Sequence, residues 1–357
     1  MKKIYFLLPN LSAGGAERVT ITIARLLKKN GVDVEFINIG SSSGEMYHWI
    51  VPEFKLISLK YKRIILAIPS IMSIMRKHPD AIFFSSREHT NFINLLGANI
   101  VNAKTIVRIP NLPYNVLWKG FSRLKMNFIK NLNKILINKT KGIIAQTEEM
   151  KDQIIQYYNI TPSAVKVISN PVDKDYIIQQ ANLPDLLSSP FNSSETNFLN
   201  ICNIAPSKGI DTLIEAWPIV KESIPNSHMY IIGRNDSPYA KSLMEKTKNL
   251  KDFTFLGFQS NPYGYMKYCD VFVLPSRMEG FPNVVLEAMC LNKRIASTNC
   301  VKVIEKLIRP GGNGYFCTPD DANELAECMI KTSHIEIETG QSDYGLFDEQ
   351  KLIEIFI

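Results

Sequence analysis

The stretch Pro275-Ser-Arg-Met-Glu-Gly-Phe-Pro-Asn-Val-Val-Leu-Glu-Ala-Met289 decides the fold of this chain, because it links a strand pattern to a helix pattern. Residues 271–274 before it, Val-Phe-Val-Leu, form a short apolar run that is typical of a parallel strand buried on both faces. Two prolines and a glycine interrupt this run, and Asn283 is a good N-cap for the helix that follows. The stretch therefore predicts a strand, a loop and a helix in succession, the repeating unit of a parallel α/β sheet.

Two carboxylates lie eight positions apart in this stretch, Glu279 in the predicted loop and Glu287 in the first turns of the predicted helix. The amino end of a helix carries a partial positive charge and free backbone N–H groups, so it attracts phosphate. The two carboxylates can accept hydrogen bonds from the hydroxyl groups of the same ligand. The pattern favours a site for a phosphorylated polyhydroxyl compound. The alternative is that Glu279 is a solvated loop acid and Glu287 only helps the helix to begin.

The same alternation of strand and helix patterns runs along most of the chain. The expected strands are short β-type runs at residues 4–8, 34–39, 81–85, 105–109, 142–145, 165–168, 198–203, 229–233, 253–256, 271–274, 294–297 and 315–317. A length of 357 residues is sufficient for two domains of ordinary size. Residues 182–197 are rich in Ser and Asn, which indicates an exposed loop or a domain boundary. We therefore expect an α/β protein with two Rossmann-like, doubly wound domains.

Composition narrows the class of protein further. Apolar residues make up 45% of the chain and charged residues 21%, which is the balance of a folded protein. The lysines at the start precede an apolar run that Pro9 ends, so a first strand is expected there rather than a secretion signal. No stretch approaches the roughly 20 apolar residues that cross a bilayer. The six cysteines include no Cys-x-x-Cys pair and indicate reduced, packed thiols of a cytoplasmic protein.

A basic segment from Lys119 to Lys141 contains lysine and arginine but no acid, interleaved with apolar and aromatic residues. This pattern suits a surface that lies against anionic lipid headgroups. A solvated basic helix is the main alternative. No recognised nucleic-acid motif accompanies the segment, so we expect no nucleic-acid partner.

The neighbourhood of Glu279 and Glu287 resembles the E-x(7)-E signature of retaining glycosyltransferases of family 4, which have the GT-B fold. Residues 10–18 contain Gly14-Gly15-Ala-Glu, which resembles the Gly-Gly-x-Glu loop of that family, and Lys208 lies in a segment that matches the family's diphosphate-binding lysine. The resemblance covers about residues 1 to 330. It implies two Rossmann-like domains that face each other across a cleft.

The resemblance also implies roles for individual residues. Glu279 and Lys208 are the expected catalytic residues, with Lys208 on the donor diphosphate, Glu279 on the donor sugar and Glu287 on the ribose hydroxyls. The expected substrate-binding residues near the donor are Gly14, Gly15, Asn203, Arg234, Gly280, Phe281, Pro282, Asn283 and Glu287. No metal or other cofactor is expected. The single Asp-x-Asp, Asp173 to Asp175, resembles the family's Asn-Pro-Val-Asp linker instead of a metal site.

Two adjacent positions depart from the family pattern. Asn203 stands five residues before Lys208, where arginine is usual, and Cys202 stands where glycine is usual. Asparagine donates a hydrogen bond but cannot neutralise a departing phosphate. The departure puts turnover, or even activity, in doubt. Arg234, after the strand at 229–233, is one candidate for the missing charge.

The acceptor side carries fewer signals. Many relatives place a histidine at the end of a first-domain strand, but the strand at 105–109 has none. His89 follows another strand and is either an acceptor contact or an ordinary loop histidine. Arg108 and Asn111 are alternative polar contacts.

Together, these features and the resemblance predict a retaining glycosyltransferase that moves a sugar from a nucleotide-diphosphate donor to an acceptor hydroxyl. Residues 1–170 form the expected acceptor domain, with a C-terminal helix at about 343–357 packing back on it, and residues 171–342 the nucleotide-sugar domain. The expected acceptor is a polyprenyl-diphosphate-linked saccharide at the inner face of the cytoplasmic membrane, in bacterial capsule, O-antigen or other lipopolysaccharide synthesis. A sugar-nucleotide 2-epimerase and a non-catalytic GT-B partner subunit remain open as alternatives.

Overall fold

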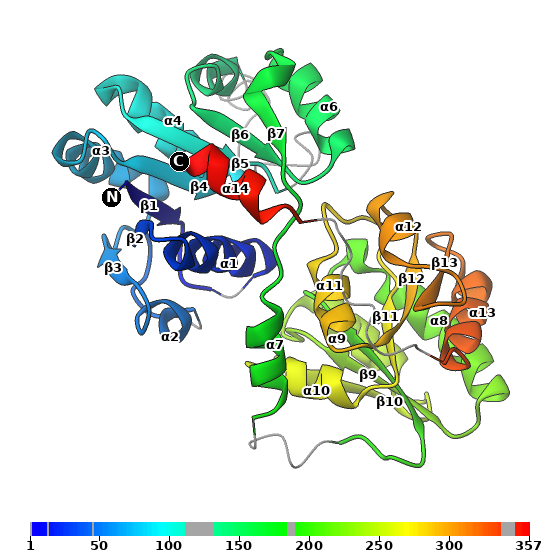
Figure 1. The fold of residues 1–357 in the computed structure, drawn as a ribbon. Helices are drawn as coiled ribbons and strands as arrows, with labels where there is room; N and C mark the ends of the chain where they lie inside the picture. Colours follow the sequence, from blue (N-terminus) through cyan, green and yellow to red (C-terminus); the bar gives the residue numbers. More distant parts are fainter. Residues whose placement is uncertain (1, 13, 45, 111–130, 184–189, 337–346) are drawn as a thin grey trace. The chain divides into compact units, whose positions relative to one another are not determined.

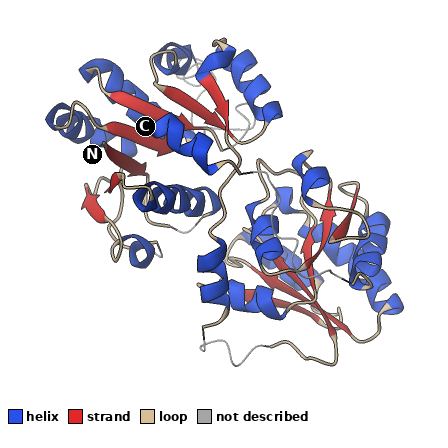
Figure 2. Cartoon of the chain, in the orientation of Figure 1, coloured by secondary structure: helices blue, strands red, loops and turns tan. Residues whose placement is uncertain are grey.

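The chain divides into two compact units. The computed structural model describes residues 2–12, 14–44, 46–110, 131–183, 190–336 and 347–357. The first unit comprises Met1–Pro171 and Gly345–Ile357, and the second comprises Val172–Tyr344. Both boundaries lie within two residues of those expected from the sequence. Each unit is a parallel sheet with helices on both faces (Figure 2).

The first unit is built on a seven-stranded parallel sheet of order β3-β2-β1-β4-β5-β6-β7. The strands are β1 (Lys3–Leu8), β2 (Asp33–Asn38), β3 (Lys55–Ser58), β4 (Ile82–Ser86), β5 (Lys104–Arg108), β6 (Gly142–Ala145) and β7 (Val165–Val167). The sequence analysis missed β3. This strand lies at the edge of the sheet and is only partly buried, so its four residues lack the continuous apolar run of the central strands.

Two helical layers cover this sheet, and β1 shows why. Tyr5 and Leu7 face one hydrophobic cluster, while Phe6 and Leu8 face the other, because successive strand residues point to opposite sides. The helices are α1 (Gly15–Lys29), α2 (Tyr47–Ile50), η1 (Ile64–Ala67), α3 (Ile68–Lys77), α4 (Glu88–Val101), α6 (Glu148–Tyr158), η3 (Pro162–Ala164) and α14 (Glu349–Phe356). Helices α3, α4 and α6 cover one face, whereas α1 and the chain's last helix, α14, cover the other (Figure 1).

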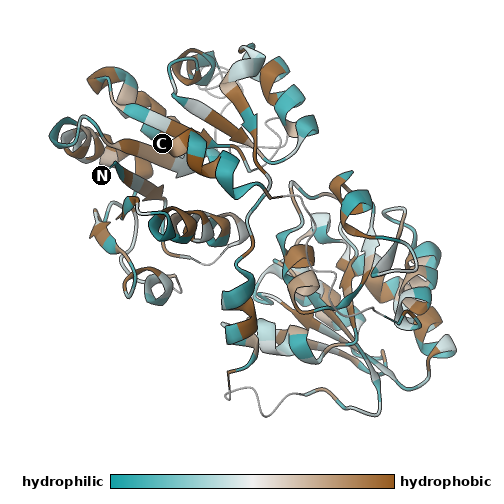
Figure 3. Ribbon diagram, in the orientation of Figure 1, coloured by the Kyte–Doolittle hydropathy of each residue, from teal (hydrophilic) through white to brown (hydrophobic). Residues whose placement is uncertain are grey.

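The second unit contains a six-stranded parallel sheet of order β10-β9-β8-β11-β12-β13. The strands are β8 (Thr196–Ile201), β9 (Ser227–Ile232), β10 (Phe253–Gly257), β11 (Val271–Leu274), β12 (Arg294–Thr298) and β13 (Gly314–Cys317). The helices are α7 (Lys174–Ala181), η5 (Pro206–Lys208), α8 (Ile210–Ser223), α9 (Pro238–Lys246), α10 (Tyr263–Tyr268), α11 (Asn283–Cys290), α12 (Val303–Leu307) and α13 (Ala322–Ser333). Every strand expected from the sequence is present, and the central strands of both units are mainly hydrophobic (Figure 3).

The start of α11 differs from the prediction. Pro282, not Asn283, occupies the N-cap position, and no side chain caps the helix. The backbone N–H of Asn283 already bonds to the carbonyl of Phe281 at 3.0 Å, and that of Val285 bonds to Pro282 at 3.0 Å. The helical turn therefore closes one residue earlier than the N-cap preference of asparagine suggests.

Strand order locates the ligand-binding edge of each sheet. In the first unit the chain builds outward from β1 to β3 and then returns to place β4 beside β1; in the second, β11 returns to lie beside β8. Ligands of doubly wound sheets bind at the carboxyl ends of the strands where the winding reverses. The loops after β1 and β4, and those after β8 and β11, are therefore the positions to inspect.

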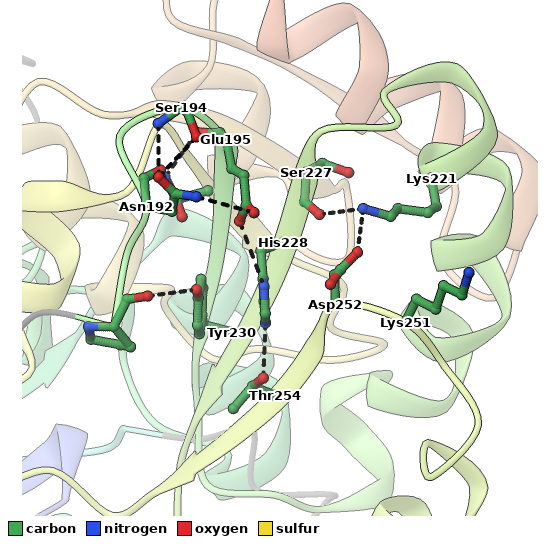
Figure 4. Close-up of polar contacts among 12 residues, drawn as sticks. Asn192, Ser194, Glu195, Lys221, Ser227, His228, Tyr230, Lys251, Asp252 and Thr254 are labelled. Carbon is green, nitrogen blue, oxygen red and sulfur yellow. Dashed lines mark hydrogen bonds and ion pairs between the residues drawn. The ribbon is translucent and has the colours of Figure 1, made fainter.

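The opposite end of the second sheet holds a separate polar cluster (Figure 4). The His228 ring stacks on Tyr230 at 4.2 Å, and its Nε2 lies 2.8 Å from the Thr254 hydroxyl. Its Nδ1 lies 3.8 Å from Glu195, and Lys221 pairs with Asp252 at 2.5 Å beside it. This cluster joins the amino ends of β9 and β10 and lies away from the edge that the winding identifies.

In the described part of the chain, no helix is both long and apolar enough to span a membrane. Most of the basic segment expected to face lipid, residues 119–130, lies outside the described residues. Its described remainder is helical over residues 131–137, where Ile135 is exposed and Ile137 is buried in the core of the first unit.

Candidate functional site

The carboxyl edge of the second sheet brings together two residues that the sequence analysis chose separately. Lys208 ends η5 in the loop after β8, and Glu279 lies in the loop after the neighbouring strand β11. The Lys208 Nζ lies 2.7 and 2.8 Å from the two carboxylate oxygens of Glu279, and the Ser276 hydroxyl donates to the same carboxylate at 2.7 Å. The side chains of Lys208 and Glu279 are 23% and 12% exposed, so a ligand can reach both.

Close backbone packing holds these two loops against each other. Gly209 has φ +62°, and a Cβ added there would lie 2.0 Å from the carbonyl oxygen of Pro275. Only glycine fits this combination of left-handed backbone and close approach. The backbone N–H of Arg277 also donates to the carbonyl of Ser207 at 2.9 Å. The loop that carries Lys208 is thus tied to the loop that carries Glu279.

Glu287, the second glutamate of the motif, lies on α11 and is 9% exposed. The Tyr263 hydroxyl on α10 contacts its Oε1 at 3.5 Å. Phe281 is 6% exposed, and its neighbour Pro282 is also buried, so the turn between the two glutamates is packed in place. Gly280 and Asn283, also expected at the donor, lie in or next to this turn.

Asn203 and Arg234 lie on the same edge, at the carboxyl ends of the neighbouring strands β8 and β9. Both side chains belong to exposed residues. The Arg234 guanidinium lies 4.7 Å from the centre of the Phe258 ring. The structure therefore puts an arginine one strand away from the position where the family motif has one, while a role for it in phosphate binding stays a prediction.

In the first unit, the corresponding edge contains an ion pair. Gly14 is the N-cap of α1, and Gly15 is its first residue. The carboxylate of Glu17 on this helix faces Arg87 in the loop after β4, with Nη2 to Oε2 at 2.9 Å and Nε to Oε1 at 2.5 Å. Burial raises the pKa of Glu17, while Arg87 and the more distant Arg108 oppose this rise. The Glu17 side chain is 3% exposed and that of Arg87 is 45% exposed.

Arg108 lies beneath this edge at the end of β5 and is only 1% exposed. Its Nη1 donates to the Ser86 hydroxyl at 3.0 Å, and its Nη2 donates to the side-chain oxygen of Asn170. Burial lowers the pKa of Arg108 to about 9, so the guanidinium keeps its charge at neutral pH. Arg108 is buried in this structure, and its expected contact with an acceptor stays a prediction.

Two predicted acceptor residues remain, and the structure describes one of them. His89 lies on the first turn of α4 and is exposed at the carboxyl edge of the sheet. Asn111 lies outside the described residues. No group of three or more His, Cys, Asp or Glu within the described residues is placed to hold a metal ion, and Asp173 caps α7 by accepting from the Tyr176 backbone N–H at 3.1 Å.

Sequence reasoning missed two contributors to the second-unit edge. Arg277 forms a bidentate pair with Asp211, with Nη1 to Oδ1 at 2.7 Å and Nη2 to Oδ2 at 2.9 Å. Arg277 lies two residues before Glu279 in the stretch 275–289, and Asp211 lies three residues after Lys208. The sequence signal for this ion pair is the opposite charge of Arg277, near Glu279, and Asp211, near Lys208.

Comparisons with known proteins agree with this fold. The Glycosyltransferase Family 4 model matches residues 13–176, and the Glycosyl transferases group 1 model matches residues 187–341. A Haemophilus influenzae protein described as an uncharacterized glycosyltransferase is 25% identical and is aligned over 99% of this chain and 98% of its own length.

A named enzyme and a solved structure extend the comparison. The N-acetylgalactosamine-N,N'-diacetylbacillosaminyl-diphospho-undecaprenol 4-alpha-N-acetylgalactosaminyltransferase of Campylobacter jejuni is 24% identical over 91% of this chain and 88% of its own. The Anabaena protein HepE, solved in complex with UDP and glucose, has a TM-score of 0.77 at 18% identity and covers 99% of this chain and 98% of its own. The two family matches and these full-length similarities confirm the GT-B fold, and the chain belongs to the family 4 glycosyltransferases and is an enzyme of that family.

Proposed function

We propose that this glycosyltransferase binds a nucleotide-diphosphate sugar at the carboxyl edge of the second sheet and transfers the sugar with retention of anomeric configuration. The observation that carries the proposal is the contact between Lys208 and Glu279, 2.7 Å long and partly exposed, where the winding of the sheet reverses. A cation beside a carboxylate provides one group for a leaving phosphate and one for sugar hydroxyls.

The charge of Lys208 is the main stabiliser of the leaving diphosphate in this proposal. In the free protein Lys208 is neutralised by Glu279. A bound diphosphate competes for the ammonium group, which has three donors and can serve both partners. The carboxylate of Glu279 then accepts hydrogen bonds from the donor sugar. Because the ammonium group is already in place, little reorganisation accompanies bond cleavage.

The packed turn between the two glutamates supplies the remaining donor contacts. Phe281 and Pro282 are buried, so the backbone around Gly280 is held at the edge. Glu287 on the following helix is assigned to the ribose hydroxyls, with Tyr263 positioning its carboxylate. Charge neutralisation by side chains makes a divalent metal unnecessary in this scheme.

The acceptor is proposed to be a polyprenyl-diphosphate-linked saccharide. Support comes from the Campylobacter jejuni relative, whose name describes transfer to a diphospho-undecaprenol-linked sugar. The first unit, with Arg87 and His89 at its edge, is the proposed acceptor unit, and the basic segment around residues 119–141 is the proposed contact with the cytoplasmic face of the membrane. Capsule or lipopolysaccharide assembly is the process that such an acceptor serves.

Asn203 bears on the rate of this enzyme. It stands where the family has arginine, and asparagine lacks the charge that arginine supplies. Replacing Asn203 with arginine tests this effect. A gain in turnover supports a weakened phosphate contact in the wild type, and an unchanged turnover shows that position 203 does not limit the rate.

The test is transfer from a panel of UDP-, GDP- and dTDP-sugars to synthetic polyprenyl-diphosphate-linked mono- and disaccharides, in the presence of EDTA. We expect one donor to be consumed, and the anomeric proton coupling of the product to match that of the donor. A product of inverted configuration contradicts the retaining mechanism. A donor converted to its 2-epimer without an acceptor identifies the epimerase instead.

A further inference from the structure

Arg277 is fully engaged by hydrogen bonds within the second unit. Its Nη1 donates to Pro206 at 2.5 Å and to Asp211 at 2.7 Å, and its Nη2 donates to Asp211 at 2.9 Å and to Thr212 at 3.1 Å. Its Nε donates to Asp320. A guanidinium has five N–H donors, so these five contacts use all of them. Arg277 therefore has no donor left for a ligand.

The partners of Arg277 come from two loops other than its own, at one edge of the sheet. Pro206 and Asp211 flank Lys208 in the loop and helix start after β8, while Asp320 follows β13. Arg277 itself lies two residues before Glu279. Asp320 adopts φ +64°, a left-handed conformation that costs energy for a residue other than glycine. The arginine thus joins the loops of β8, β11 and β13 through one planar group.

The charges around Arg277 reinforce this arrangement. Hydrogen bonds to Asp211 raise the pKa of Arg277 despite its partial burial. Burial alone would raise the pKa of Asp211, but the hydrogen bonds and charge of Arg277 lower it below its ordinary value. The Arg277 and Asp211 side chains are 28% and 30% exposed, so each is accessible enough to be replaced without opening the core.

We propose that Arg277 is a positioning residue that fixes the distance between Lys208 and Glu279, and so prepares the donor site for a nucleoside diphosphate. The inference rests on the proposed function of that edge. Lys208 lies between two partners of Arg277, at positions 206 and 211, and Glu279 lies two residues along the same loop as Arg277. Losing the guanidinium removes its hydrogen bonds to the Lys208 loop and leaves the backbone contact between Arg277 and Ser207 to hold the two loops. Small displacements of a binding group can cost large factors in affinity and rate.

The first test measures binding of UDP, GDP and dTDP by calorimetry at 20 °C, with the best of the three then compared between wild type and Arg277→Met. We expect the affinity of Arg277→Met to fall by about tenfold or more, at a temperature where thermal unfolding shows the protein to be folded. A purely structural arginine would lower the melting temperature and leave this affinity unchanged. That result overturns the inference.

Asp211→Asn distinguishes positioning from direct contact. If Arg277 positions the loops, weakening its main partner lowers the affinity in the same direction as Arg277→Met. If Arg277 instead contacts the diphosphate, Asp211→Asn frees the guanidinium and leaves the affinity equal or higher, which contradicts the inference. Asp320→Asn removes the charge from one of the four partner residues of Arg277 and is expected to give a smaller loss, so the test stands even if Arg277→Met does not fold.

Arg294→Met is the matched control. Arg294 begins β12 in the same unit, at the other end of the sheet, and its Nη1 donates to Ser333 at 2.7 Å. We expect nucleotide affinity to be unchanged in this variant. If wild type binds none of the three nucleoside diphosphates, the proposed function fails. If wild type binds and Arg277→Met binds equally well, only the positioning role fails.

Discussion

The carboxyl edges of the two sheets share one topology but carry opposite arrangements of charge. In the second unit the cation, Lys208, and its partner Glu279 are both partly exposed. In the first unit the carboxylate Glu17 is buried, and the cation Arg87 is the exposed member of the pair. The same winding of a parallel sheet therefore gives one edge where a ligand can compete for both members of a pair, and one where it meets mainly the arginine.

The largest expected effect is the loss of the second-unit cation. We expect Lys208→Met to lower kcat/KM for transfer by a factor of about 100 to 1,000, because it removes a fixed charge from the leaving diphosphate. Arg87→Met, at the first-unit edge, should leave the affinity for a nucleoside diphosphate unchanged. Steady-state kinetics and calorimetry measure the two effects.

Lys221→Met is the control for removing a lysine from the second unit. Lys221 pairs with Asp252 at the opposite end of the sheet. If it loses as much transfer activity as Lys208→Met, the effect is general destabilisation and not the loss of a phosphate contact.

Two glycine-to-alanine substitutions, one at the carboxyl edge of each sheet, compare how far the neighbouring atoms can move to admit a Cβ. In Gly209→Ala the new Cβ meets the backbone of Pro275 at 2.0 Å, whereas in Gly14→Ala it meets the end of the Glu17 side chain at 2.5 Å. The Pro275 backbone is held by the sheet, whereas the Glu17 carboxylate can shift at the cost of its contact with Arg87, so we expect a loss of stability of about 3 kcal/mol for Gly209→Ala and a smaller one, of about 1 kcal/mol, for Gly14→Ala. Thermal or urea unfolding measures both.

Gly31→Ala separates the free-energy cost of a left-handed backbone from the cost of a steric clash between the new Cβ and its neighbours. Gly31 has φ +78° with nothing within 4 Å of an added Cβ. We expect a loss of about 1 kcal/mol from the left-handed backbone alone. Equal losses at Gly31 and Gly209 would show that the contact with Pro275 does not hold the loops together.

The smallest effect concerns the end of the second sheet opposite its proposed site (Figure 4). Burial lowers the pKa of His228, although Asp252 and Glu195 oppose the shift. The unfolded chain then binds more protons than the folded chain, so stability falls as pH drops through the ordinary histidine range. We expect His228→Asn to reduce this fall between pH 7 and 5.5 by under about 1 kcal/mol.

The control for the His228 prediction is the same substitution at another histidine of the second unit. His334→Asn replaces an exposed histidine of the same unit. Unfolding curves across pH that are the same for wild type and His228→Asn would show that the histidine is not buried enough to matter. Nucleotide affinity should be unchanged in His228→Asn, since the cluster is remote from the edge with Lys208.

The sequence predicted the fold well because apolar runs and loop breakers are local signals. Strand residues 271–274 and the loop with Glu279 could be read directly from their neighbours. The short edge strand β3 could not, because half-exposed strands lack a continuous apolar run. The N-cap of α11 was wrong by one residue for the same reason that helix boundaries often are: backbone closure, not side-chain preference, set it.

The site was predicted residue by residue but not as a set of contacts. Lys208 and Glu279 were both chosen, yet their pairing depends on two strands being neighbours in the sheet. The five hydrogen bonds of Arg277 depend on three loops meeting, which no spacing in the sequence encodes. The burial of Arg108 could not be predicted from the sequence either, because the residues that cover it are distant in the chain.

The measurement that tests the central claim most directly is a calorimetric titration of UDP, GDP and dTDP into wild type and Lys208→Met, with EDTA present throughout. We predict that at least one of the three binds wild type without a divalent ion and that Lys208→Met weakens this binding at least about tenfold. Binding that needs a metal ion, or that is equal in both proteins, would contradict the account.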